Sequence, residues 1–186
     1  MFCQPGFEAF QTALPDSSYN YLEIGVFNGD SIAQLASENP GKTMYGIDPF
    51  IEDGFTTEHT QKLQGQSIDT QRAATYNEIK DLTNVVLFEV TSQAFANILT
   101  DEMVTDMNIA WVLIDGSHNA DDVSIDVDLA MRLIGTKKGG IVMDDLNLKG
   151  PRKGFEKLQL EYSDQISLIQ DIYPSHRDHM ALITIN

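Results

Sequence analysis

The sequence predicts an α/β fold in which helices cover both faces of a mostly parallel sheet. Short, continuously apolar runs alternate along the chain with segments whose apolar residues have helical spacing. This alternation is typical of parallel strands that are buried on both faces. The last two apolar runs are joined by one short polar segment, so we expect them to pair antiparallel.

Local signals mark where the expected strands and helices begin and end. The first apolar run ends at Gly25, and Pro49 stops the second. Pro151 is suited to the first turn of a helix, and residues 123–134 carry apolar side chains at helical spacing. The expected strands are 21–25, 43–48, 85–90, 110–115, 139–144, 166–172 and 180–185, and the expected helices are 31–37, 92–99, 123–134 and 151–162.

The length and composition predict one globular domain. The 186 residues fit a single domain, 1–186, with enough chain to bury a core. Only one cysteine is present, which excludes an internal disulfide. Residues 51–72 are polar and rich in glutamine and threonine, and are too long for a tight turn. We therefore expect this segment to be a functional loop or a small lid.

The charge balance argues against nucleic-acid and membrane partners. The chain has 28 acidic and 12 basic residues, a net charge of −16. Such a field repels nucleic acid and anionic membranes. No apolar run approaches the ~20 residues that span a bilayer, and the first residues lack the pattern of a signal peptide. We expect a cytoplasmic protein.

The first candidate binding motif is segment 23–31, which follows the first expected strand. Ligands of open α/β sheets bind beyond the carboxyl ends of the strands. Gly25 and Gly29 allow a tight turn and close approach of a ligand. Ser31 opens the next helix, where free N–H groups favour polar or anionic groups. Glu23 is a charge within an apolar strand, so it contacts either a ligand or a loop amide.

The ends of the next two strands supply further candidate ligand contacts. Asp48 is placed to accept hydrogen bonds from both hydroxyls of a ribose, although an Asp-Pro turn is the alternative. Ser92 and Gln93 could hold the edge of an adenine, although Ser92 could instead cap a helix. A dinucleotide is disfavoured, because its G-x-G-x-x-G fingerprint differs from the spacing of Gly25 and Gly29.

Together, segments 21–31, 45–49 and 91–95 resemble the first three cofactor motifs of class I S-adenosylmethionine-dependent methyltransferases. From residue 19 onward the chain is particularly similar to the divalent-metal-dependent O-methyltransferases, both the catechol type and the macrocin type. The resemblance implies a Rossmann-like seven-stranded sheet of order 3-2-1-4-5-7-6 with one antiparallel strand. It also implies S-adenosylmethionine as cofactor, contacted by Glu23, Gly25, Phe27, Gly29, Ser31, Asp48, Ser92, Gln93 and Asp115.

A second group of polar residues follows the fourth and fifth expected strands. Asp115 and His118 follow one strand, and Asp144 and Asp145 follow its expected neighbour. Three carboxylates so close repel one another, and their oxygens suit Mg²⁺, Mn²⁺ or Ca²⁺. The resemblance assigns Asp115, Asp144 and Asp145 to the metal, although the catechol type has Asp-Asn at the last two positions. The alternative is strand-end acids, a helix-capping Asp and a surface His.

The resemblance also implies an enzymatic role for the second group. His118 lies where the macrocin type has a catalytic base and the catechol type a lysine, and we expect it to act beside Asp115. We expect methyl transfer to a hydroxyl of a sugar or another small polyhydroxylated acceptor, assisted by a divalent cation. The alternatives are metal-independent transfer to N or O, and cofactor binding without chemistry.

Two further expectations concern the cover of the site and the remaining histidines. The segment before the first strand is short, so we expect residues 51–72, or a neighbouring subunit of a homo-oligomer, to cover the acceptor. We expect His59, His176 and His179 to be ordinary loop or surface residues.

Overall fold

The computed structural model describes residues 18–51, 67–172 and 179–186. The strands are β1 Asn20–Ile24, β2 Met44–Ile47, β3 Val85–Phe88, β4 Ile109–Ile114, β5 Gly139–Met143, β6 Ile166–Ile172 and β7 Met180–Ile185. The helices are α2 Asp30–Glu38, α4 Ile68–Ile79, α5 Ser92–Ile98, α6 Asp101–Met107, α7 Ala120–Ile134 and α8 Lys149–Glu161.

The strands form one sheet whose order confirms the prediction from the sequence. The order is β3-β2-β1-β4-β5-β7-β6. The pairs from β3 to β5 are parallel, whereas β7 runs antiparallel to both β5 and β6. The chain therefore has the seven-stranded Rossmann-like topology, with β7 as the one reversed strand.

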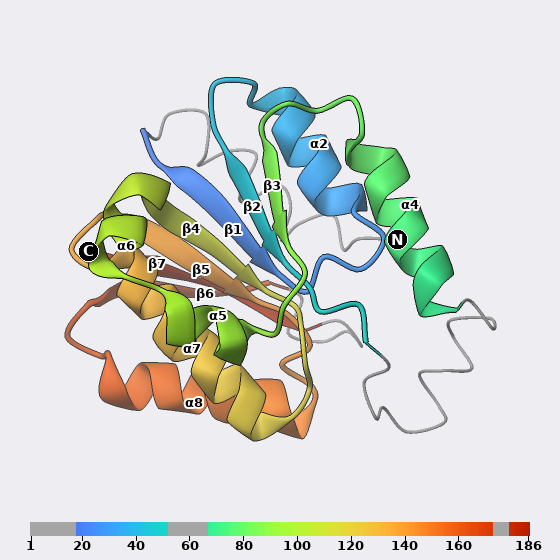
Figure 1. The fold of residues 1–186 in the computed structure, drawn as a ribbon. Helices are drawn as coiled ribbons and strands as arrows, with labels where there is room; N and C mark the ends of the chain where they lie inside the picture. The colour runs from blue at the N-terminus through green and yellow to red at the C-terminus, as the bar shows by residue number, and fades with distance from the viewer. Residues whose placement is uncertain (1–17, 52–66, 173–178) are drawn as a thin grey trace.

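Helices cover the two faces of the sheet, as Figure 1 shows: α2 and α4 lie on one face, and α5 to α8 on the other. Tyr21 packs with Ile32 and Leu35 of α2 in one buried cluster. Val112 packs with Val127 and Leu133 of α7 in the other. Every residue of β5 is buried. Burial on both faces explains why the strands have continuously apolar sequences.

Two described helices were missed by the sequence prediction. Helix α4 begins within segment 51–72, which was expected to be a loop, and Ser67 caps it by accepting a hydrogen bond from the N–H of Thr70. Only Thr75 of α4 is buried, so the helix has almost no apolar periodicity. Helix α6 is a short helix capped by Thr100. Residues 52–66, the rest of the expected loop, lie outside the described residues.

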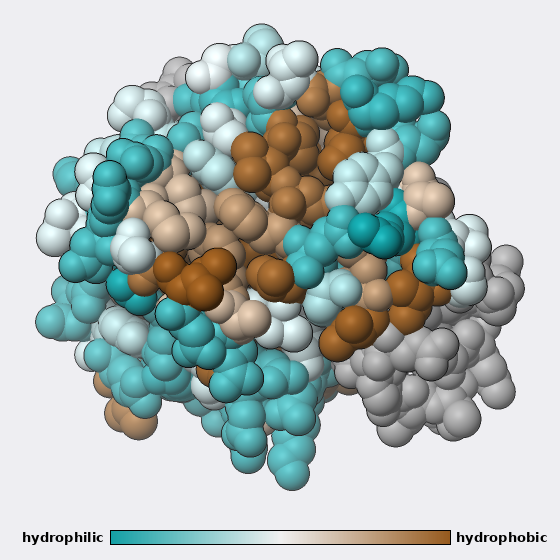
Figure 2. All heavy atoms as spheres, viewed as in Figure 1, coloured by the Kyte–Doolittle hydropathy of each residue, from teal (hydrophilic) through white to brown (hydrophobic). Residues whose placement is uncertain are grey.

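Apolar side chains reach the surface at the edge of the sheet. Figure 2 shows them gathered over β3, which is an edge strand of the sheet. Val86 in this strand is 40% exposed. In the part of the chain that the structure describes, no helix is long and apolar enough to cross a membrane.

The contact between β4 and β5 predicts a strong effect of one glycine substitution. A Cβ atom on buried Gly139 would lie 1.8 Å from the carbonyl oxygen of Ala110. We expect Gly139→Ala to lower the free energy of unfolding by roughly 1–3 kcal/mol, the typical cost of overpacking. Urea denaturation measures this change. Gly41→Ala is the control, because nothing lies within 4 Å of its added Cβ. Equal stability of the two variants would contradict the close packing of these strands.

Candidate functional site

Four strands end in register at one edge of the sheet. Ile24 at the end of β1 pairs with Ile47 of β2 and with Ile114 of β4. Ile114 in turn pairs with Met143 of β5. The residues that follow these four therefore share one rim, and they are Gly25, Asp48, Asp115 and Asp144.

The loop between β1 and α2 depends on Gly25 to reach this rim. Gly25 has φ +91° and donates its N–H to the carbonyl oxygen of Ile47 at 2.9 Å. A Cβ atom there would lie 2.1 Å from the carbonyl oxygen of Asp115. Phe27 also has a positive φ and is 44% exposed. The buried Oδ1 of Asn28 has no hydrogen-bond partner among the described residues. This loop therefore holds a buried acceptor whose hydrogen bond is not made by any described residue.

Asp48 fixes the same loop through its carboxylate. Its Oδ2 accepts hydrogen bonds from the N–H groups of Val26 at 3.0 Å and Phe27 at 2.9 Å. Its Oδ1 accepts from the N–H of Phe50 at 2.8 Å. A carboxylate has about four acceptor sites, so Asp48 can hold the loop and still accept a hydrogen bond from a hydroxyl group.

Glu23 lies directly below the loop and is 1% exposed. Its carboxyl group accepts hydrogen bonds from the hydroxyls of Tyr21, at 3.0 Å, and Ser31. Burial raises the pKa of Glu23 to about 8, although both hydrogen bonds oppose the shift. The neutral form therefore predominates at pH 7. Ser31 is the second residue of α2 and therefore does not cap the helix. Its hydroxyl donates to Glu23 instead.

The residues expected to hold an adenine begin α5. Thr91, rather than Ser92, caps this helix by accepting a hydrogen bond from the N–H of Ala94. The hydroxyl of Ser92 instead hydrogen-bonds to the carboxyl group of Asp126 in α7. Gln93 is exposed. Of the two predicted residues, Gln93 is thus the more accessible to a ligand.

Asp126 is a buried acid that the sequence analysis missed. It is 1% exposed, and its Oδ1 has no hydrogen-bond partner among the described residues. Burial raises its pKa to about 7, and the charge of Asp122 adds to the shift. An acid between the apolar residues Val123 and Val127 was the signal that could have revealed it.

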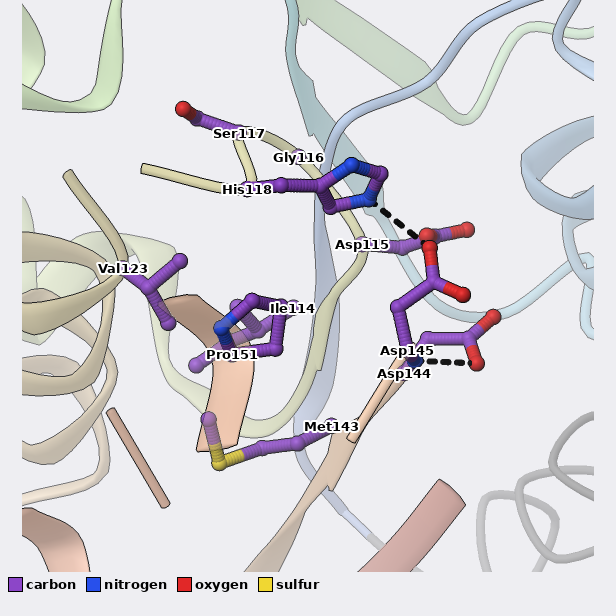
Figure 3. Close-up of a pocket in the computed structure, with 10 residues that line it drawn as sticks. All are labelled: Ile114, Asp115, Gly116, Ser117, His118, Val123, Met143, Asp144, Asp145 and Pro151. Carbon is purple, nitrogen blue, oxygen red and sulfur yellow. Dashed lines mark hydrogen bonds and ion pairs between the residues drawn. The ribbon is translucent and has the colours of Figure 1, made fainter. Parts of the chain in front are cut away.

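His118 and Asp145 form an ion pair across the rim, with 2.7 Å between Nε2 of the histidine and Oδ2 of the aspartate. Figure 3 shows the imidazole pointing at this carboxylate. Asp144 turns back on the chain, and its Oδ1 accepts a hydrogen bond from the N–H of Asp145 at 2.6 Å. Asp145 itself has a left-handed backbone, with φ +53°. The loop after β5 therefore presents Asp145 to the loop after β4.

A small pocket opens beside this ion pair. Its apolar side is formed by Ile114, Val123, Met143 and Pro151, and its polar side by Asp115, Gly116, Ser117, His118, Asp144 and Asp145 (Figure 3). Burial raises the pKa of Asp115 well above its usual value, and the nearby charges of Asp144, Asp145 and Glu23 raise it further. Negative charge on Asp115 is therefore costly unless a positive or hydrogen-bond-donating group enters the pocket.

The three predicted metal ligands share the rim, but their side chains do not form a ligand set. Among the described residues, no group of three or more His, Cys, Asp or Glu side chains is arranged to hold a metal ion. The carboxylate of Asp145 is paired with His118, and that of Asp144 binds the neighbouring backbone. The described side chains therefore do not form a preformed site for the cation that the sequence predicts.

Of the other three histidines, the structure describes only His179. His59 and His176 lie outside the described residues. His179 was expected to be an ordinary loop residue, but its ring lies between Arg152 and Asp171. Its carbonyl oxygen also accepts a hydrogen bond from the N–H of Leu146 at 2.7 Å. His179 therefore contacts the loop that carries Asp144 and Asp145.

Comparison with known proteins gives a family and several similar folds. A family model described as a methyltransferase domain matches residues 22–146. A search of curated proteins found no match. A candidate O-methyltransferase from Klebsiella pneumoniae is similar with a TM-score of 0.66 and 15% identity, over 97% of this chain and 79% of that chain.

Two further solved structures are similar in fold. A candidate caffeoyl-CoA O-methyltransferase from Staphylococcus aureus has a TM-score of 0.63 and 14% identity, over 100% of this chain and 85% of that chain. CalS11, a TDP-rhamnose 3′-O-methyltransferase of calicheamicin biosynthesis, has a TM-score of 0.57 and 16% identity, over 97% and 76% of the two chains. At such low identity these likenesses show a common fold alone.

The buried carboxyl group of Asp126 predicts a pH-dependent stability. Its pKa rises from 3.8 to about 7 on folding. Above pH 4 the carboxyl group of Asp126 loses its proton more readily in the unfolded chain than in the folded chain. The free energy of unfolding should therefore decrease as the pH rises toward 7. Asp126→Asn removes this titration. Its stability relative to the wild type should therefore increase between pH 4 and 7, by up to a few kcal/mol.

Urea denaturation at pH 4.5, 6 and 7.5 measures this difference. Asp121→Asn is the matched control, because Asp121 lies on the same helix and is exposed. A stability difference between Asp126→Asn and the wild type that does not change with pH would contradict the buried acid.

Proposed function

This chain belongs to the methyltransferase-domain family, and we propose that it transfers the methyl group of S-adenosylmethionine to a hydroxyl oxygen of a small molecule. The observation that carries the proposal is the concentration of acidic groups at the carboxyl ends of β1, β2, β4 and β5. These groups are Glu23, Asp48, Asp115, Asp144 and Asp145. This set is called the acidic rim below.

The acidic rim favours a cationic cofactor over a dinucleotide. S-adenosylmethionine carries an ammonium and a sulfonium group, whereas a dinucleotide carries an anionic pyrophosphate. A cation near Glu23 and Asp115 would favour their ionised forms and so reverse the cost of burial. A pyrophosphate would add to the repulsion. Asp48, and Oδ1 of Asn28, which has no hydrogen-bond partner among the described residues, suit the hydrogen-bond donors of a ribose and an amino acid.

His118 and Asp145 supply the proton acceptor for the transfer. When bound, S-adenosylmethionine supplies an electrophilic methyl group on sulfur. His118 would take the proton of the acceptor hydroxyl, while the bond between that oxygen and the methyl carbon would replace the carbon–sulfur bond of the cofactor. The carboxylate of Asp145, 2.7 Å from Nε2 of His118, orients the ring, and a neutral imidazole that donates from Nε2 has Nδ1 as its proton acceptor. The transfer therefore leaves S-adenosylhomocysteine, a methyl ether and a protonated His118.

Two features support a small acceptor. The pocket beside His118 is small, and it combines an apolar side with an acidic rim that suits the hydroxyl donors of a sugar or another polyhydroxylated molecule. CalS11, by its name, methylates a deoxysugar nucleotide on a similar fold. We propose an acceptor of this polyhydroxylated class.

Assistance by a divalent cation is the second candidate mechanism. It is supported by the chemistry of Asp115, Asp144 and Asp145, because carboxylate oxygens on one rim are the ligands that Mg²⁺ prefers. It could leave the contact with His118 in place, because only Oδ2 of Asp145 makes that contact and the carboxylate keeps further acceptor sites. The direct proton acceptor is preferred here because its geometry is already present.

The first prediction from this proposal concerns cofactor binding. S-adenosylhomocysteine at 100 times its Kd should stabilise the fold by about 2.7 kcal/mol, seen as a rise in melting temperature, and NAD should give no rise. Asp48→Ala should lose most of the rise, because the ribose loses its acceptor and the loop loses three hydrogen bonds.

Asp81→Ala is the control for this measurement, because Asp81 is an exposed acid just after α4. It should keep the full rise in melting temperature. Stabilisation by NAD, and none by S-adenosylhomocysteine, would refute the proposed function.

The second prediction concerns His118. In an assay that detects S-adenosylhomocysteine release over a panel of hydroxylated acceptors, His118→Ala should lower kcat by about 10²–10⁴-fold, the usual share of a general base. Its Kd for S-adenosylhomocysteine should stay within about twofold, because the cofactor motifs follow β1 to β3. Asp145→Asn should lower kcat less, since the imidazole remains.

A chelator in the same assay separates the two mechanisms. Turnover that persists in excess EDTA, and is lost in His118→Ala, supports the direct proton acceptor. Turnover that EDTA abolishes and Mg²⁺ restores, with His118→Ala near the wild-type rate, supports the metal-assisted mechanism instead.

A further inference from the structure

The loop between β5 and α8 is held by hydrogen bonds to both backbone groups of Leu146, its N–H and its carbonyl oxygen. The N–H of Leu146 donates to the carbonyl oxygen of His179 at 2.7 Å. Its own carbonyl oxygen accepts a hydrogen bond from Nε of Arg152 at 3.0 Å. Leu146 is 1% exposed. The loop that carries Asp144 and Asp145 is therefore tied on one side to β7 and on the other to the first turn of α8.

Arg152 and His179 also bind each other. The NH2 group of Arg152 lies 3.1 Å from Nδ1 of His179. A guanidinium has only donors, so Nδ1 must be the acceptor and Nε2 must carry the proton. Nε2 then donates to Oδ1 of Asp171 in β6, at 3.2 Å. The guanidinium carbon lies 5.9 Å from the ring centroid of Phe155. One arginine thus joins the loop, α8 and the β6–β7 pair.

Asp145 needs such support because its backbone is strained. It has φ +53°, in the left-handed region. This conformation is uncommon for a residue other than glycine, although aspartate adopts it more often than most, and it persists where the surroundings impose it. The backbone group that follows it is the N–H of Leu146, which His179 holds. The result of this restraint is the 2.7 Å contact between Asp145 and His118.

We propose that Arg152 and His179 are positioning residues, which fix Leu146 and thereby hold Asp145 against His118. Neither residue lines the pocket beside His118. The importance of this link for catalysis rests on the proposed function, whereas the link itself does not. It can therefore be tested without a known acceptor.

The variants separate the link from a general loss of packing. Arg152→Met keeps a long apolar side chain and removes both hydrogen bonds to Leu146 and His179. His179→Leu keeps the size of the ring and removes the acceptor for Arg152. His179→Asn is the matched control, because its side-chain oxygen can replace Nδ1 as that acceptor. Asp145→Asn gives the reference state in which the ion pair with His118 is lost.

The readout is the ¹⁵N NMR spectrum of the histidine side chains. The signals of His118 are identified by their absence in His118→Ala. In Arg152→Met and His179→Leu, these signals should move at least half of the way from the wild-type position to that in Asp145→Asn. In His179→Asn they should remain near the wild-type position. Circular dichroism selects the folded variants, and either of the first two suffices for the test.

Unchanged His118 signals in a folded Arg152→Met or His179→Leu would overturn the inference, as would an equal shift in His179→Asn. Titration of the wild type with S-adenosylhomocysteine tests the proposed function separately. A wild type that does not bind it would refute that function, while the histidine spectra would still decide the positioning role.

Discussion

The whole site depends on the parallel register that brings the ends of four strands into one row. Ile24, Ile47, Ile114 and Met143 are paired across the sheet, so the residues after them share one edge. The row can close only because Gly25 lets the first loop approach the backbone of Asp115. Motifs distant in the sequence thus become one surface through backbone hydrogen bonds, before any side chain contributes.

Negative charge on the buried acids at this edge lowers the stability of the fold. Glu23 and Asp115 are buried, and their raised pKa values show that their negative charge is unfavourable without a ligand. Folding driven by the core would not select several acids at one rim, but binding a cation or a hydrogen-bond donor would. The contact between His118 and Asp145 adds an imidazole to the same rim. In the proposed function, one cluster of acids therefore serves both cofactor selection and proton transfer.

The loop between β5 and α8 is held by parts of the fold that lie outside the acidic rim. His179, the residue just before the reversed strand β7, supplies its carbonyl oxygen, and α8 supplies Arg152. Both meet at Leu146, next to the strained Asp145. The antiparallel end of the sheet thus does more than extend the core, because it restrains the loop that faces His118.

The sequence by itself determined the α/β class and the residues of the rim, because strand burial and the motifs at strand ends are local patterns. The strand order came from the resemblance of these motifs to a known family, since local patterns do not show which strands are neighbours. The sequence missed α4, which buries only Thr75 and so has no apolar stripe. It also missed Asp126 and the contacts of His179, and it did not show that Asp145 pairs with His118. Those outcomes depend on which side chains from distant elements meet. Only tertiary packing decides the partner of a polar group, and that partner decides whether an acid is buried, paired or available to a ligand.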